Sequence, residues 1–534
     1  FEEDFYGIRG QLEIDVTDSL VARLVMNYDR MPKHHEGIYK VISSYGLPNG
    51  DSAALPADLE NPNFPGVGAG NDAFGYRDPY SDKQTGAFND DGFFKMNRLS
   101  PSLYLTWTTD AFTLSSITNY TKFKSRYLED CDGSPLDACK YPLNQDLKQW
   151  SQELRLNGTA DALTWTTGAY FLKIDTDFYQ GFDQPAFVGT DFGFSSDNPG
   201  TQKLTSYALF GQLEFMFTDK LRGTVGLRYT HDRKTFDSQT LFRELGPALG
   251  GDGLYDPPLL VYDFRKETVG ALAKVTDNLF SGKVQLDYIA SDDMLFYVGV
   301  SRGVKGSGFN SNNSAAVSIE QTPFGDESVM AYEVGAKITA LDRRLRVNTA
   351  IFYYDYKDFQ AFQYVGLSGL VTNNDAKFSG FEVEVTAVPA EGLDLSVGVS
   401  HLFDATVKNV GTANRGIRNQ DASNAAKWSA TGMARYSHPL GVGRVAIQWD
   451  GNFMDDRYAS TDNTGGNFIK GSFIHNARLS YSLPESGWDF AFYVKNLSDK
   501  DRQNFVFDFS QAAGQQLRSY APPRQWGVSV RKQF

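Results

Sequence analysis

Apolar and polar residues alternate along most of the chain, and this period of two is typical of β-strands with two different faces. In the segment LVARLVMNYD, Leu24 and Tyr28 face one way, whereas Arg23 and Asp29 face the other. The closing segment WGVSVRKQF alternates in the same way. We expect about 19 strands, with the approximate spans 4–15, 20–29, 94–107, 112–125, 147–157, 162–176, 202–217, 221–232, 279–289, 294–303, 328–339, 345–358, 376–387, 393–406, 426–437, 443–456, 471–483, 488–496 and 518–534.

The connections between these strands fall into two alternating classes. Short polar turns such as 158–161 and 341–344 alternate with long segments such as 31–93 and 498–517, which are rich in Gly, Asn, Asp, Pro and Ser. Transmembrane β-barrels show this asymmetry, with short periplasmic turns and long extracellular loops. Structureless loops of that length are uncommon in compact soluble domains. We therefore predict an all-β fold, a transmembrane antiparallel β-barrel.

The composition agrees with a barrel and excludes other classes. The chain has 534 residues, of which 14% are aromatic. No run reaches the roughly 18 apolar residues that identify a membrane helix, whereas a membrane strand needs only about 9–11 residues. A helical membrane protein is therefore excluded. The net charge of −14 argues against nucleic acid as a partner, because nucleic-acid-binding proteins normally carry a basic surface.

The connections also give the direction of the strands. The first strand runs into a short turn and the last strand follows a long loop, so both descend toward the periplasm. This arrangement gives an odd strand number, whereas single-chain bacterial barrels have an even one. The chain opens on FEEDFYGIRGQ, which has no signal peptide. We therefore expect residues 1–534 to form a barrel domain that lacks its first strands.

Five blocks, in order along the chain, resemble the β-barrel of TonB-dependent outer-membrane receptors. They are VSRGVKGSGFN (Val300–Asn310), AYEVGAKITALDRRLRVNTAIFYYDYKDFQ (Ala331–Gln360), FSGFEVEVTAVPAEGLDLSVGVSHLFDATV (Phe378–Val407), FYVKNLSDKDRQ and PPRQWGVSVRKQF (Pro522–Phe534). The resemblance covers most of the chain. Barrels of this family have about 22 strands around a plugged lumen. The resemblance therefore implies that about three strands and the plug domain are absent from this sequence.

The resemblance implies a receptor in the outer membrane of a Gram-negative bacterium. Such a receptor takes up a scarce nutrient with TonB-supplied energy, here most simply a ferric siderophore or a similar chelate. The implied partners are the lipid bilayer with its lipopolysaccharide, a small-molecule ligand, and the TonB–ExbB–ExbD complex through the absent N-terminal part. The terminal Phe534 would be the signal that the barrel-assembly machinery reads. No cofactor is implied, and the ligand stays open because receptors for many ligands share one barrel.

Three other classes of protein remain as alternatives. The first is a passive porin, although open porins have 16–18 strands. The second is an outer-membrane enzyme, but the chain contains no HExxH, G-x-S-x-G or phosphate-loop motif and no evident nucleophile–base pair. The third is a soluble β-propeller, which would need a repeat of about 40–50 residues that is not present. We therefore expect no catalytic residues.

The two cysteines, Cys131 and Cys139, lie in the polar stretch SRYLEDCDGSPLDACKYP. A close pair on an exposed loop predicts a disulfide in an oxidising compartment. The alternative is a pair of free surface thiols. Redox or zinc motifs of the CxxC type are absent.

A small histidine cluster lies in the first long loop. His34, His35 and Glu36 combine imidazole and carboxylate groups, which can bind a transition metal. The alternative is an ordinary solvated loop beside the rim of the barrel.

Two further groups of residues are candidates for ligand contact. Phe182, Phe187, Phe192 and Phe507 belong to long loops, where exposed aromatic rings suit capture of an amphipathic nutrient. The alternative for the rings is membrane anchoring in an aromatic girdle. Arg302 and Lys305 lie at the mouth of the strand 294–303, beside glycines, and could attract an anionic chelate into the barrel, the alternative being ordinary charges of the lumen.

Overall fold

The computed structural model describes most of the chain. The described residues are 4–34, 39–43, 72, 76–137, 139–184, 193–245, 259–311, 318–365, 368–412, 416–510 and 514–533. Five residues of the sequence hypotheses lie outside these ranges: His35, Glu36, Phe187, Phe192 and Phe534.

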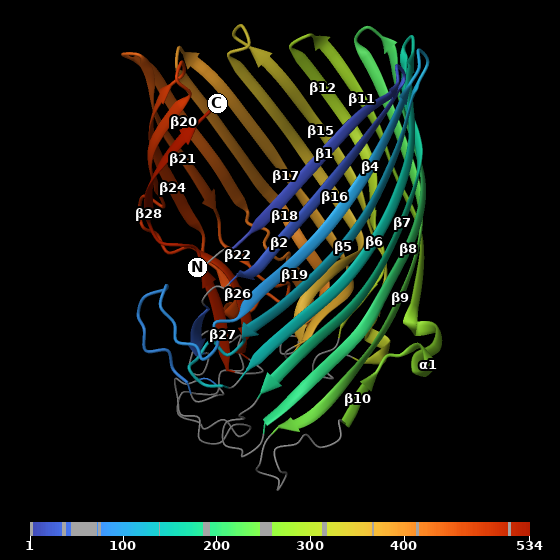
Figure 1. Cartoon of the computed structure of the whole chain (residues 1–534), viewed down its shortest axis with the longest axis vertical. Coiled ribbons are helices and arrows are strands. Elements are labelled where there is room, and N and C mark those ends of the chain that lie inside the picture. Colours follow the sequence, from blue (N-terminus) through green and yellow to red (C-terminus); the bar gives the residue numbers. More distant parts are fainter. Residues whose placement is uncertain are drawn as a thin grey trace.

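One large antiparallel sheet dominates the described chain and curves around as an incomplete barrel wall (Figure 1). It has 21 strands, of which β10 and β19 only extend the pairing of β9 and β18, so 19 strands follow one another in chain order. The predicted all-β barrel fold and its number of strands are therefore confirmed. The 19 strands are β1 (Tyr6–Thr17), β2 (Leu20–His34), β4 (Phe93–Thr108), β5 (Thr113–Asp130), β6 (Lys140–Ala160), β7 (Leu163–Gln184), β8 (Gly193–Thr218), β9 (Leu221–Leu245), β11 (Lys274–Ser291), β12 (Met294–Lys305), β15 (Glu327–Ala340), β16 (Leu345–Val365), β17 (Ser368–Ala390), β18 (Leu393–Thr412), β20 (Trp428–Leu440), β21 (Gly443–Met454), β24 (Ser472–Leu483), β25 (Trp488–Lys495) and β28 (Gln525–Lys532).

Smaller elements belong to the long connections. They are β3 (Lys40–Ser43), β10 (Leu259–Asp263), α1 (Lys266–Val269), η2 (Gly270–Ala273), β13 (Gly308–Phe309), η3 (Ile319–Gln321), β14 (Pro323–Phe324), β19 (Gly416–Asp421), β22 (Arg457–Tyr458), η4 (Gly465–Asn467), β23 (Phe468–Ile469), β26 (Gln503–Phe509) and β27 (Gln515–Tyr520). Within the described ranges, none of the helices has the length and apolar character needed to cross a membrane.

The two ends of the sheet differ, as the connection lengths predicted. The long connections lie at one end, the lower one in Figure 1, and the strands at the other end are joined by short turns. The exception is the pair β16 and β17, which extend farther at the lower end and are joined there by only two residues. The turn between β17 and β18 requires glycine, because Gly392 has φ +78° and an added Cβ would lie 2.1 Å from the carbonyl oxygen of Ser437. We call these the short-turn end and the long-loop end.

The two faces of the sheet differ in chemistry. On β9, the side chains of Val225 and Leu227 on the outer face are 46% and 62% exposed. Thr224, on the inner face of the same strand, is buried. Inner-face charges pair with one another, as Arg222 does with the fully buried Asp287 at 2.7 Å. An outer face of exposed apolar side chains and an inner face of paired charges is the arrangement of a barrel wall in lipid.

The two edge strands, β1 and β28, run in the same direction. β1 enters a short turn, and β28 follows a long connection, so both run from the long-loop end to the short-turn end. No backbone pairing joins them among the described residues. Because neighbouring strands of this sheet are all antiparallel, direct pairing of these two edges would break the pattern.

The predicted start of the last strand, at residue 518, is wrong. Residues up to Tyr520 belong to β27, which pairs with β26 and β3 in a separate sheet. Barrel strand β28 begins only at Gln525. Pro522 and Pro523 separate the two, since proline lacks the N–H group that a sheet ladder needs.

Candidate functional site

A three-stranded loop sheet lies at the long-loop end and joins the first and last long connections. Strands β26, β27 and β3 pair in that order, so Lys40–Ser43 lies beside Gln515–Arg518 although the two segments are far apart in the chain. Alternation along β26 puts Phe505, Phe507 and Phe509 on one face. The Phe507 ring lies 4.6 Å from that of Phe505, 5.7 Å from that of Phe509 and 5.8 Å from that of Tyr39. The loop sheet therefore carries one continuous aromatic face.

A buried ion pair anchors the loop sheet. The Lys40 ammonium lies 2.9 Å from the Asp78 carboxylate, with both side chains 6–7% exposed. The same ammonium donates hydrogen bonds to the carbonyl oxygens of Tyr80 and Thr85. A buried charge is tolerated only with such partners, so Lys40 fixes β3 against residues 78–85.

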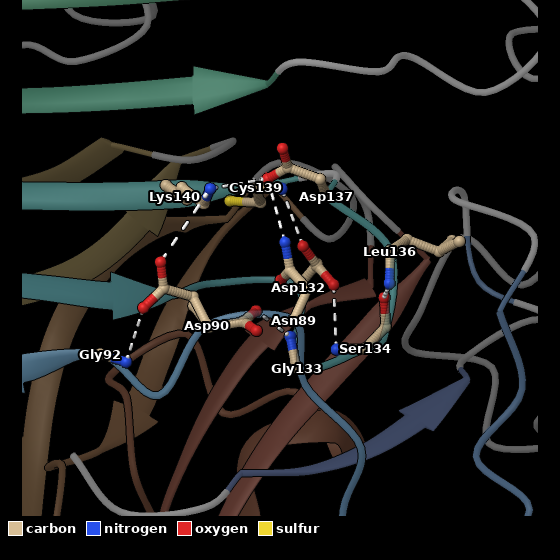
Figure 2. Close-up of polar contacts among 11 residues, drawn as sticks. Asn89, Asp90, Gly92, Asp132, Gly133, Ser134, Leu136, Asp137, Cys139 and Lys140 are labelled. Atoms are coloured by element: carbon tan, nitrogen blue, oxygen red, sulfur yellow. Dashed lines mark hydrogen bonds and ion pairs between the residues drawn. The ribbon is translucent and has the colours of Figure 1, made fainter. Parts of the chain in front are cut away.

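The segment from Asp130 to Cys139, which we call the cysteine loop, packs against the loop sheet. A disulfide joins Cys131 and Cys139, whose Cα atoms are 5.2 Å apart. The fully buried Asp132 carboxylate accepts N–H bonds from Ser134 at 2.9 Å and Cys139 at 2.7 Å (Figure 2). The prediction that the cysteines lie on an exposed loop is wrong, because they are only 9% and 3% exposed.

Contacts between the cysteine loop and the loop sheet explain this burial. Gly133 has φ +60°, and an added Cβ would lie 2.8 Å from a methyl group of Val41. The side-chain amide of Gln515 donates to the carbonyl oxygen of Cys131 at 3.4 Å. The sequence alone gave no sign of these neighbours, because they come from the first and last connections of the chain.

Asp130, at the start of the cysteine loop, has a strongly perturbed carboxyl group. Burial raises its pKa to about 7, and the nearby charge of Asp132 adds to this effect, although the N–H group of Gly133 partly opposes it. Oδ2 of Asp130 is buried without a hydrogen-bond partner. The group therefore titrates near neutral pH.

Cavities lined by charged residues lie against the inner face of the described sheet. One of about 400 Å³ is lined by Asp450, Asn476 and the loop residue Arg502. The second, of about 480 Å³, lies nearer the short-turn end and is lined by Arg435 and Arg531, among others. Asn476 donates to Asp450 at 2.6 Å, so the first cavity has a fixed acceptor beside a cation. Sequence reasoning missed these residues, because nothing distinguishes them from other polar residues of inner faces.

The structure separates the two predicted cations. Lys305 ends β12 at an exposed position and shares the inner face with Tyr297. Arg302 instead shares the outer face with Val298 and Val300, and its guanidinium donates to the carbonyl oxygen of Phe280. Arg302 is thus on the lipid side, and only Lys305 stays a candidate for ligand contact.

The aromatic and metal hypotheses have mixed outcomes. Phe182 is half-buried near the end of β7 and alternates onto the same face as Phe178, whose ring stacks on the buried Phe236. Phe507 is part of the aromatic face of the loop sheet. His34 ends β2, and across the described ranges no three His, Cys, Asp or Glu residues converge as a metal site requires. His35 and Glu36 lie outside the described residues, so the metal hypothesis for His34 with these two neighbours stays a prediction.

The apolar outer face, the polar inner face and the elaborate loops at one end define the class: a transmembrane β-barrel. The family model described as "TonB dependent receptor-like, beta-barrel" matches residues 42–497. The chain therefore belongs to the TonB-dependent receptor family. Proteins of this family reside in the outer membrane of Gram-negative bacteria and are transport proteins rather than enzymes, as the sequence predicted.

Solved structures show the same fold. The ferric yersiniabactin uptake receptor FyuA from Yersinia pestis superposes with a TM-score of 0.70 at 16% identity, covering 99% of this chain and 70% of that one. The siderophore receptor PiuA from Acinetobacter baumannii superposes with a TM-score of 0.70 at 16% identity, covering 99% of this chain and 74% of that one. The pesticin receptor of Yersinia enterocolitica is 25% identical over 244 residues, or 45% of this chain. That match spans only 31% of the pesticin receptor.

Proposed function

We propose that this chain is the barrel of a receptor that takes up a ferric siderophore or a similar chelate, with energy supplied through TonB. The observation that carries the proposal is the aromatic face of Phe505, Phe507 and Phe509 on an anchored loop sheet at the long-loop end. Family membership makes this the extracellular end, where a ligand arrives. Relatives named as siderophore receptors add support.

The arrangement suits an amphipathic, anionic chelate. Aromatic rings stabilise the apolar rim of such a ligand by removing it from water. Lys305 on the inner face of β12 and Arg502 at the cavity beside Asp450 would attract its negative charge. No bond is made or broken in this process, which agrees with a transport protein.

Uptake of radioactive iron tests the proposal. The full-length natural gene is expressed in a host that lacks its own siderophore receptors, and a panel of catecholate, hydroxamate and phenolate chelates of ⁵⁵Fe is supplied with and without TonB. We expect uptake of one chelate class that stops without TonB. Loss of one buried aromatic ring costs about 1.5–3 kcal/mol, so Phe507→Ala should raise the half-saturating concentration by about tenfold or more.

Phe403→Ala is the matched control, because Phe403 is 60% exposed on the outer face and should leave uptake unchanged. Uptake that persists without TonB would instead favour a passive porin. Failure of every ferric chelate, together with uptake of another nutrient, would refute the siderophore assignment. An effect of Phe403→Ala equal to that of Phe507→Ala would refute the aromatic face as the binding surface.

A further inference from the structure

Two carboxylates from different long connections meet at one short loop. Residues 459–467, which we call the η4 loop, join β22 to β23 at the long-loop end and finish with η4. Within this loop, the carboxylate of Asp462 accepts a hydrogen bond from the side-chain amide of Asn467. Asp508 belongs to β26, and its carboxylate accepts a hydrogen bond from the Thr464 hydroxyl at 2.5 Å. The two negative charges are close enough to act on each other.

The η4 loop supports β26 from the side away from its aromatic rings. Alternation along β26 puts Val506 and Asp508 on the face opposite to Phe507. Val506 is buried, and the Asp508 carboxylate lies against the backbone of the loop. An added Cβ on Gly466 would lie 2.1 Å from Oδ2 of Asp508, so the close approach needs glycine at this position.

A strand from a third connection holds the other side of the η4 loop. The side chain of Asn463 accepts the backbone N–H of Asp421 at 2.7 Å and donates to the carbonyl oxygen of the same residue at 2.9 Å. The side-chain amide of Gln420 donates to the carbonyl oxygen of Asp462 at 3.2 Å. Both partners belong to β19. The protein itself therefore fixes the backbone that carries Asp462.

Two buried oxygen atoms of the η4 loop have no hydrogen-bond partner. Asn467 is 1% exposed; its amide nitrogen donates to Asp462, while its Oδ1 atom is unpaired. Thr461 precedes Asp462 in the chain, is also 1% exposed, and has an unpaired Oγ1 atom. A buried acceptor without a partner is costly. These oxygens therefore point to a group that binds here from outside the chain.

The charges and the donor types identify the class of that group. Asp462 and Asp508 are half-buried, and no ion pair includes either of them within the described ranges. Charges removed from water are normally paired or bound to a metal. The groups that converge are carboxylate, amide and hydroxyl oxygens, which suit hard cations such as calcium and magnesium. Two carboxylates balance the charge of one divalent cation.

We propose that the η4 loop and β26 bind a calcium ion through the carboxylates of Asp462 and Asp508 and the amide oxygen of Asn467. Calcium takes about 6–8 oxygen ligands in flexible geometry, so hydroxyl, backbone and water oxygens can complete the set, whereas magnesium demands a near-ideal octahedron. This donor set differs from the nitrogen and sulfur ligands typical of transition metals. The ion would join the η4 loop to β26 and so hold the aromatic face in place.

Amide hydrogen exchange of the full-length protein in detergent tests this inference. The protein is stripped with a chelator and then measured at calcium concentrations up to about 10 mM, without any transported ligand. Calcium sites of extracellular modules have dissociation constants of about 0.1–1 mM, so saturation should raise protection of β26 and the η4 loop by about 10- to 100-fold. The amides of β9 serve as the internal control and should not respond.

A matched pair of variants assigns the effect to the proposed ligands. Asp462→Asn keeps the size of the side chain and removes one charge. Loss of a partner outside the coordination shell already costs about 10- to 100-fold in metal affinity, so loss of a ligand should raise the half-saturating calcium concentration by about tenfold or more. The control is Asp456→Asn, which removes the same charge from an exposed position of the same connection and should respond like the natural protein.

Exchange without calcium separates binding from folding. Because removal of one carboxylate relieves repulsion, Asp462→Asn without calcium should be protected as well as the natural protein or better. Protection of β26 that does not change with calcium would overturn the proposal, since the site would then hold only water. An equal calcium response in Asp462→Asn, or the same gain from magnesium at the same concentration, would also overturn it. Because no transported ligand is present, these outcomes do not depend on the proposed uptake function.

Discussion

Replacement of Lys40 tests how the extracellular loops are held together. Lys40, in strand β3 of the loop sheet, is 5% exposed, and its ammonium forms an ion pair with Asp78. Lys40→Met keeps the length of the side chain and removes the charge. Asp78 is then left buried without its partner, and the carbonyl oxygens of Tyr80 and Thr85 lose a donor.

The expected cost is large for a single residue. Removing one member of a buried pair costs about 3–5 kcal/mol, because the remaining charge is uncompensated. Replacing both members by apolar residues of similar volume is often close to neutral. Lys40→Met should therefore destabilise the loop sheet strongly, whereas the double change with Asp78→Leu should restore much of the loss.

Hydrogen exchange measures this local stability without unfolding the barrel. Every 1.4 kcal/mol changes an equilibrium tenfold, so a loss of 3–5 kcal/mol lowers amide protection by a factor of about 10² to 4 × 10³. We expect that loss at Val41 and Leu517, which are paired in the loop sheet, and none in β9, which serves as the internal control. Unchanged protection in Lys40→Met, or a double variant as unprotected as the single one, would refute the anchoring role.

Three further predictions concern the cysteine loop and the turns. Replacing Cys131 and Cys139 by serine should destabilise the cysteine loop by about 2–3 kcal/mol in the chain-entropy account, seen as faster exchange of its amides. The pKa of Asp130 is raised to about 7, above its value in the unfolded chain, so the cysteine loop should lose stability as pH rises from about 4 through 7. Asp130→Asn should remove this pH dependence, which amide hydrogen exchange of the loop at pH 5 and pH 8 measures. Gly392→Ala should lower the melting temperature more than Gly270→Ala, since both have positive φ but only the first meets a backbone atom, and equal shifts would contradict this.

The barrel strands could be predicted because each repeats one simple physical rule. A residue pointing into lipid must be apolar and its neighbour, pointing inward, can be polar, so a period of two is imposed wherever the chain crosses the membrane. The predicted starts at Leu393 and Trp488 agree with β18 and β25 for this reason. Beyond the membrane the rule no longer applies. Strand β8 therefore begins at Gly193, nine residues before the predicted start at 202.

The loop sheet could not be predicted because its pattern depends on contacts between distant segments. Lys40 reads as a solvated lysine in the sequence, and only the approach of residues 78–85 makes it a buried anchor. Arg302 shows the opposite error: its position beside glycines suggested the lumen, but one step of alternation places it outside. The direction of a side chain in a strand depends on register, and a shift of one residue reverses it. Charge near a barrel mouth therefore indicates a ligand only once the register is known, and the register keeps Lys305 on the inner face while it places Arg302 on the outer one.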